Sequence, residues 1–421
     1  MDYKKASEKP KDVYRWFLVG ALTIIMMGFY GAYLSFGVLL KPVLGEFGWT
    51  RTTISGAMST AAGISGLLGI LSGRLTDKYG ATLLIYAGAF LGVLGYLLLI
   101  WMHSVWQLYV YFGIIIGISF SVCWTPVTAT VSKFFSGKRV LALGITTSGI
   151  TLGHMFIPPL VAVFINAEGW RFAYAMLALI IFMSAIPAVV ILRKNSPKAM
   201  EMEKKYQIKQ NKNVDKAIDS GKQQKWTVSE AIKTLSFWIL MATGFVTAAG
   251  FFFIAVHIVA YATDMGIDPK AAAFILTFMG GANILGKLLS PSIVVKIGSK
   301  LTLLILLALQ ALALFMLMWA HSLWVLFLLG SIFGFGFGAS SPLRMSMISD
   351  FFGVQSIGTM IGIIEIAWSL GAISGPVMAG YVFDISGSYN VAFLTGGLIV
   401  LTGMVATYFL KKPLVLGDAQ I

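Results

Sequence analysis

A lysine lies near the middle of one long apolar segment of the chain. Lys287 is part of "AAAFILTFMGGANILGKLLSPSIVV", and Asn283 precedes it by four residues, which puts both side chains on one helix face. A cation at mid-membrane depth is costly and marks a substrate or ion pathway. The alternative is a lysine that snorkels to the interface, but Lys296 is about ten residues away, roughly 15 Å along a helix. We therefore interpret Lys287 as a residue of a substrate or ion pathway, with Asn283 beside it.

A carboxylate occupies a second apolar segment at a similar depth. Glu365 lies in "TMIGIIEIAWSLG", and Trp368 follows on the same helix face. We expect Glu365 to pair with Lys287 when no anion is bound. An anion would displace Glu365 most easily if Glu365 took up a proton, so this pair predicts coupled movement of a proton and an anion. A fixed structural ion pair is the alternative.

Other polar and aromatic residues of apolar segments are weaker candidates. Arg344, in "SSPLRMSMISDFF", is either a second anion contact or a gate residue paired with Glu365 or Asp350. His257 is a candidate proton carrier, and a hydrogen-bonded helix contact is its simpler interpretation. Four aromatic residues are candidates to face the substrate: Trp124, Tyr30, Tyr33 and Trp368.

The composition requires these residues to lie in a membrane protein. The chain has 421 residues, of which 58% are hydrophobic and 11% charged, against about 25% charged in soluble domains. Apolar segments of about 20 residues span a bilayer as helices. Twelve such segments are predicted: 16–43, 52–76, 82–101, 105–132, 140–165, 170–192, 235–262, 270–296, 300–319, 323–349, 356–383 and 388–410.

Lysine and arginine positions predict the orientation. Basic residues cluster in the N-terminal tail, in the central segment 193–226 and after alternate helices. By the positive-inside bias, both termini and the central loop are cytoplasmic, in a multi-pass plasma-membrane protein. The predicted parts are a tail (1–15), a six-helix bundle (16–192), a basic linker (193–234), a second bundle (235–410) and a tail (411–421).

The two bundles repeat one another. "WMHSVW" at 101–106 matches "WAHSLW" at 319–324, an offset of 218 residues, and the same offset relates Gly144 to Gly362. Gly113 and Gly117 match Gly330 and Gly334 one residue out of step. A parallel repeat of this kind places the substrate site between the halves, near the bilayer midplane.

Several classes of function are excluded. The net charge of +14 reflects the clusters that set membrane orientation, and no basic platform with interleaved aromatics points to nucleic acid. No phosphate-binding GxxxxGK[ST] loop indicates ATP, and the single cysteine, Cys123, allows no cysteine-rich metal site. No nucleophile–base motif indicates an enzyme. We expect no cofactor and no metal; the expected partners are the substrate, protons and membrane lipid.

Two segments resemble known family signatures. "GRLTDKYG", with Asp77 and Lys78, resembles the loop motif of the major facilitator superfamily, although Ala81 and Thr82 replace its final basic pair. "FFSGKRVLALGITTSGITLG" (134–153), with Lys138 and Arg139, resembles the monocarboxylate transporter signature. The resemblance implies the major facilitator fold and a cytoplasmic gate at these four charged residues.

The same resemblance bears on substrate binding. The family's D-x-x-x-R pair, whose arginine grips a carboxylate, falls on Asn283 and Lys287. The second lysine of the neighbouring oxalate–formate exchangers falls on Trp368. The sequence thus predicts a secondary transporter of a small organic anion, a monocarboxylate, with proton symport. The alternatives are an anion exchanger and a receptor that does not transport, although the central loop is too short for a signalling domain.

Overall fold

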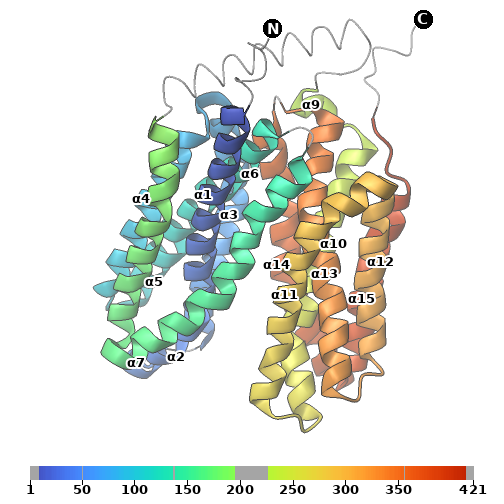
Figure 1. The fold of residues 1–421 in the computed structure, drawn as a ribbon. Helices are drawn as coiled ribbons and strands as arrows, with labels where there is room; N and C mark the ends of the chain where they lie inside the picture. The colour runs from blue at the N-terminus through green and yellow to red at the C-terminus, as the bar shows by residue number, and fades with distance from the viewer. Residues whose placement is uncertain (1–8, 50, 136–137, 195–225, 355, 414–421) are drawn as a thin grey trace, which may run out of the picture.

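The computed structural model describes residues 9–49, 51–135, 138–194, 226–354 and 356–413, and the regular elements in these ranges are helices (Figure 1). The first bundle contains α1 (Lys9–Leu34), α2 (Phe36–Phe47), α3 (Arg51–Tyr79), α4 (Ala81–Ile100), α5 (Val105–Leu108), the π-helix η1 (Tyr109–Ile116), α6 (Gly117–Phe134) and α7 (Arg139–Lys194). After the short α9 (Val228–Ala231), the second bundle contains α10 (Leu235–Asp264), α11 (Pro269–Ile297), α12 (Ser299–Leu317), α13 (Leu323–Phe352), α14 (Ile357–Ser386) and α15 (Tyr389–Tyr408).

Within the described ranges, 11 helical segments are long and apolar enough to cross a membrane. The longest of them, Arg139–Ile191 in α7, contains Gly169 with a left-handed φ of 85°. This residue turns the chain back, so α7 holds the two predicted helices 140–165 and 170–192. The predicted fold class, an all-α membrane protein of twelve helices in two bundles, is confirmed. Most of the predicted linker 193–234 lies outside the described residues.

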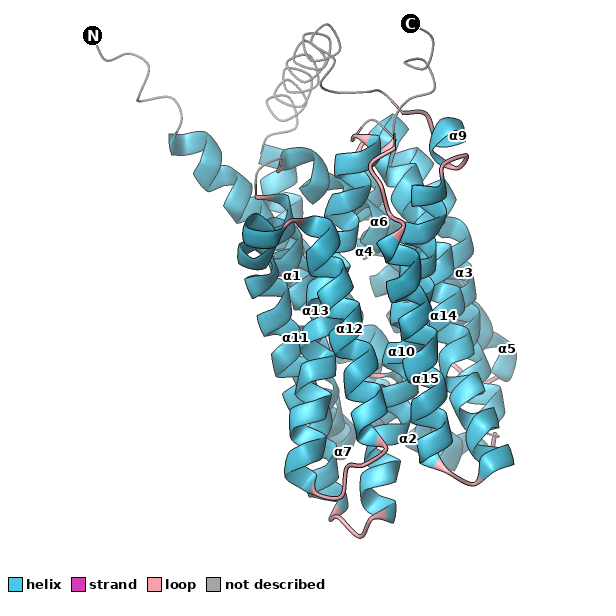
Figure 2. Ribbon diagram, turned by 90° about the vertical axis from the view of Figure 1, so that its right-hand side faces the viewer, coloured by secondary structure: helices cyan, strands magenta, loops and turns pink. Residues whose placement is uncertain are grey.

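The two bundles lie side by side, and the described part of the chain begins and ends at the same end of the molecule (Figure 1). We call this the linker end. Helices α3 and α7 end there, the described chain resumes there at Trp226, and α14 begins there. The ribbons of the two bundles are closer at the linker end than at the opposite end (Figure 1). Turned by 90°, the long helices run side by side along the molecule (Figure 2).

Glycines let the two bundles touch at two related crossings. A Cβ on Gly362 of α14 would overlap the carbonyl oxygen of Gly69 in α3, and a Cβ on Gly144 of α7 would lie 2.5 Å from the carbonyl oxygen of Lys287 in α11. The 218-residue offset relates Gly69 to Lys287 as it relates Gly144 to Gly362. Lys287 therefore occupies the second of two symmetry-related backbone contacts between the bundles.

The π-helix η1 explains why part of the repeat is one residue out of step. It spans Tyr109–Ile116, between the tryptophan-containing repeat, which keeps the offset of 218, and Gly117, which matches Gly334 at 217. A π-helical turn accommodates one extra residue within a continuous helix. The first bundle thus carries a residue in this helix that its counterpart α13 lacks.

Candidate anion-binding site

The Lys287 side chain is buried between the bundles. It is 5% exposed and projects from α11 toward α7 of the other bundle. Its Nζ donates to the carbonyl oxygen of Thr147 at 2.9 Å and to Thr151 Oγ1 at 3.1 Å. The ammonium lies beside two uncharged oxygens of α7. A snorkelling lysine would be exposed, so this alternative does not fit.

Asn283 lies beside Lys287 as the helical spacing predicts. It is 6% exposed, and its Oδ1 accepts a hydrogen bond from Thr151 Oγ1 at 2.9 Å. Sequence reasoning missed Thr147 and Thr151. Their i, i+4 spacing was a usable signal, because it places both on one face of α7, and the 218-residue offset makes Thr147 the counterpart of Glu365.

Glu365 belongs to a second polar cluster. The charged group that acts electrostatically on Glu365 is Arg344 of α13, and Arg344 is buried at 2% exposure. Arg344 Nη1 donates to Thr247 Oγ1 of α10 at 3.1 Å. Lys287 makes its polar contacts with α7 instead. The expected direct pairing of Lys287 with Glu365 is therefore absent from this structure, since each side chain has nearer partners on other helices.

Aromatic residues of the first bundle face the Glu365 cluster. The Trp124 side chain of α6 approaches Glu365, yet Trp124 Nε1 and Glu365 Oε1 are both buried without a hydrogen bond of normal geometry. The Tyr30 ring packs edge-on against the Trp124 ring, with 5.9 Å between the ring centroids. Tyr30 is also close enough to Glu365 for an electrostatic interaction. Trp124 and Tyr30 of the first bundle thus lie next to Glu365 of the second.

Three other predicted residues make further contacts. Tyr33 packs on Phe120 at 4.5 Å between ring centroids, and its hydroxyl donates to the carbonyl of Met58 at 3.4 Å. Trp368 lies 6.3 Å from Phe252 of α10, ring to ring. His257 lies 6.2 Å from Tyr389 of α15.

Asp77 joins the bundles at the linker end. Its carboxylate accepts hydrogen bonds from Gly358 N at 3.2 Å, Thr359 N at 2.9 Å and Thr359 Oγ1 at 3.0 Å, all in the first turn of α14. Lys133 of α6 pairs with the same carboxylate at 3.3 Å. The first N–H groups of a helix lack partners within it and attract anions. Asp77 therefore clamps α3 to α14.

A second ion pair crosses the bundles nearby. Arg139, at the start of α7, pairs with Asp350 near the end of α13, and its Nε donates to the carbonyls of Ser132 at 3.1 Å and Phe135 at 3.0 Å. Lys78, in contrast, places its Nζ 5.0 Å from the Tyr79 ring, and Lys138 is exposed. Of the predicted gate residues, the structure thus brings Asp77 and Arg139 to the contact between the bundles, and it adds Lys133.

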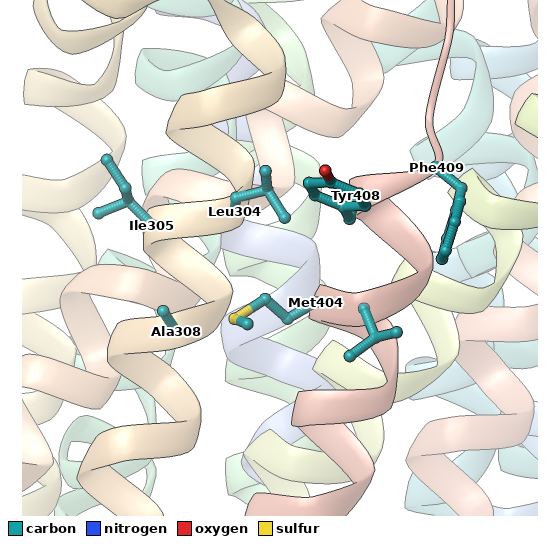
Figure 3. Close-up of a pocket in the computed structure, with 7 residues that line it drawn as sticks. Leu304, Ile305, Ala308, Met404, Tyr408 and Phe409 are labelled. Carbon is teal, nitrogen blue, oxygen red and sulfur yellow. The ribbon is translucent and has the colours of Figure 1, made fainter.

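An apolar pocket lies elsewhere, on the outer face of the second bundle (Figure 3). It encloses about 410 Å³ between α12 and α15, and neither Lys287 nor Glu365 lines it. Its lining residues are Leu304, Ile305, Ala308, Met404, Val405, Tyr408 and Phe409. None of these lining residues is charged, and the pocket lies away from the contact between the bundles, so it is not the candidate site.

Two repeated helical bundles with buried charges at their contact define a membrane transporter. The chain belongs to the Major Facilitator Superfamily, whose family model matches residues 18–320 and 240–418. It is similar to monocarboxylate transporter 13 of Rattus norvegicus, 24% identical over 399 residues, 94% of this chain and 89% of the relative. It is also similar to monocarboxylate transporter 2 of Homo sapiens, 26% identical over 415 residues, 94% of this chain and 85% of the relative.

Solved structures agree on the fold. The proton:xylose symporter XylE, bound to 6-bromo-6-deoxy-D-glucose, superposes with a TM-score of 0.71 at 16% identity, covering 96% of this chain and 97% of that one. The transporter FucP, in the outward conformation, superposes with a TM-score of 0.66 at 15% identity, covering 94% and 99%. Membership of the superfamily and the similarity to monocarboxylate transporters make the protein a transporter and not an enzyme.

Proposed function

We propose that the protein carries a small organic anion, a monocarboxylate, across the plasma membrane by alternating access, together with a proton. The observation that carries this proposal is the Lys287 ammonium, buried at the contact between the bundles and hydrogen-bonded to the opposite one. A cation there meets any anion that passes between the bundles. The similarity to proteins named monocarboxylate transporters supports the same substrate class.

The residues of the candidate site favour a single carboxylate. Lys287 supplies one cation at the contact of α11 with α7, whereas Arg344 belongs to the second cluster with Glu365. Trp368 stands where a second lysine would grip a dicarboxylate. The lysine ammonium is a point charge and lacks the bidentate geometry of arginine. Lys287 therefore suits small monocarboxylates that differ in the group attached to the carboxylate.

The second cluster supplies the coupling to protons. While Glu365 is ionised, it offsets the charge of Arg344. A proton on Glu365 removes that offset, and the contact between the bundles then attracts an anion more strongly. Binding of a proton and binding of an anion therefore favour one another, as linkage requires.

Alternating access requires contacts that open at one end while others close. The Asp77 clamp on α14 and the Arg139–Asp350 pair hold the linker end together. We place this end at the cytoplasm, because the basic residues of the chain gather there and in the adjacent central segment. The anion would then enter from the opposite end and leave once these contacts break.

Transport assays in proteoliposomes test the proposal. Purified wild type should accumulate labelled lactate, pyruvate or formate when a pH gradient is the only driving force, and Lys287→Ala should lose this uptake. Lys296→Ala is the matched control, because Lys296 lies on the same helix but is exposed at its end. Uptake only against a preloaded anion would instead indicate exchange, and binding without flux a receptor. Lys287→Ala transport at the wild-type rate and affinity would contradict the proposed site.

A further inference from the structure

One hydroxyl contacts both residues of the candidate anion-binding pair. Thr151 Oγ1, on α7 of the first bundle, accepts a hydrogen bond from Lys287 Nζ at 3.1 Å and donates one to Asn283 Oδ1 at 2.9 Å. The three polar groups form a chain from ammonium through hydroxyl to amide. Thr151 is thus the central member of a side-chain connection between the bundles.

The donors of Lys287 show what this connection leaves available. An ammonium has three N–H donors and no acceptor. Two of them are directed at α7, to the Thr147 carbonyl and to Thr151 Oγ1. One donor remains, and its direction is set by the other two. In a buried site, successive hydrogen bonds of this kind also polarise and strengthen one another.

We propose that Thr151 is a positioning residue for the transported anion: its hydroxyl fixes the Lys287 ammonium and the Asn283 amide so that the third N–H of Lys287 meets the carboxylate. This inference rests on the proposed function. It assigns to the first bundle a direct part in a binding site whose charge comes from the second. Binding therefore depends on α7 and α11 being in contact.

The internal repeat supports the assignment independently. At the offset of 218 residues, Thr151 corresponds to Ser369 of α14. Ser369 also faces the other bundle, since a Cβ on Gly66 of α3 would lie 2.9 Å from its Oγ. Both crossings thus place a hydroxyl against the opposite bundle. At the α7–α11 crossing, the hydroxyl of Thr151 has Lys287 and Asn283 as polar partners.

Two substitutions separate the hydroxyl from the shape of Thr151. Thr151→Val keeps the branched shape and removes the hydroxyl, whereas Thr151→Ser keeps the hydroxyl and removes the methyl group. The probe is labelled lactate, pyruvate or formate, whichever the wild type carries fastest in proteoliposomes. We expect Thr151→Val to raise KM about tenfold, as the loss of one hydrogen bond to a charged group implies, with kcat within about twofold of wild type. Thr151→Ser should restore KM to within about threefold.

The outcomes distinguish this inference from the function on which it rests. An unchanged KM in Thr151→Val, beside lost transport in Lys287→Ala, overturns the role of Thr151 and leaves the proposed function. Equal defects in Thr151→Val and Thr151→Ser, or a fall in kcat alone, also overturn it. Unchanged transport in Lys287→Ala overturns both.

A measurement without substrate completes the test. The melting temperatures of Thr151→Val, Lys287→Met and the double variant in detergent should be non-additive, because each single substitution breaks the same hydrogen bond. Additive shifts would overturn the connection between the two side chains, whether or not the variants transport.

Discussion

Glu365 and Arg344 interact electrostatically with one another, while Lys287, at a similar depth, makes its polar contacts with α7. Apart from Arg139 at the linker end, the buried charges are therefore divided between two clusters. One joins α11 to α7 and holds a single cation. The other joins α13 and α14 near Trp124 and holds a cation and a carboxylate. This division allows anion binding and proton binding to be tested by separate substitutions.

Neutralising Glu365 should uncouple transport from the proton. In Glu365→Gln, no carboxylate is left to take up a proton, and Arg344 keeps its full charge. We expect accumulation of labelled lactate driven by a pH gradient to fall at least tenfold, while counterflow stays within about threefold of wild type. Glu168→Gln, at an exposed carboxylate near the bend of α7, should change neither. Wild-type accumulation by Glu365→Gln would show that the proton binds elsewhere, with His257 as the next candidate.

Removing the charge of Asp77 should loosen the linker end. Asp77→Asn weakens three hydrogen bonds from α14 and the ion pair with Lys133, and a hydrogen bond to a charged group contributes about 1.5–3 kcal/mol. The reporter is Ser132→Cys, at a buried residue beside Arg139, in a background with Cys123→Ser. Its reaction with a water-soluble thiol reagent should become about tenfold faster or more in Asp77→Asn.

The control for the Asp77 substitution is its neighbour. Lys78→Gln should leave the reaction rate of the reporter unchanged, because Lys78 lies over the Tyr79 ring. If Lys78→Gln accelerated the reaction as much as Asp77→Asn, the opening would reflect the net charge of the loop and not the clamp on α14.

The sequence predicted the parts of this molecule that depend on helix length and spacing. Apolar runs defined the spans, and the i, i+4 spacing placed Asn283 with Lys287. The sequence did not predict which side chains Asn283 and Lys287 contact. Contacts across the bundles depend on how each helix is rotated and where it crosses another. Adjacent residues do not share a helix face, so Asp77 reaches α14 while Lys78 does not. Lys133, 56 residues further along the chain, supplies the basic partner instead.

Glu46 should make a small contribution to stability that acid removes. The Arg171 guanidinium binds this carboxylate at 2.7 Å and the Trp170 indole donates to it at 2.6 Å; these hydrogen bonds, that of Arg171 foremost, lower the pKa of Glu46. A lowered pKa stabilises the folded protein above the unfolded value, about 4.3, and this stabilisation is lost as the pH falls through the folded pKa.

Because the pair is partly exposed, the effect is modest. Glu46→Gln should lower the melting temperature by about 1–2 °C at pH 7, and by less near pH 3.5. Glu168→Gln serves as the control and should show no such difference. A melting temperature that fell by the same amount at both pH values would mean that packing, and not ionisation, accounts for the loss.

The crossing of α7 and α11 should tolerate no side chain at Gly144. A Cβ there would lie 2.5 Å from the carbonyl oxygen of Lys287 and 3.2 Å from its carbonyl carbon. Backbone atoms cannot rotate away, so the two helices would have to separate, and the contacts of Lys287 with Thr147 and Thr151 would lengthen. We expect Gly144→Ala to reduce lactate transport at least tenfold and to lower the melting temperature.

Gly281→Ala is the control, because on α11 nothing lies within 4 Å of the added atom. This variant should transport normally and gain slightly in stability, since alanine favours a helix over glycine by about 1 kcal/mol. If both variants lost transport equally, helix flexibility and not the close approach at Lys287 would be the property that transport requires.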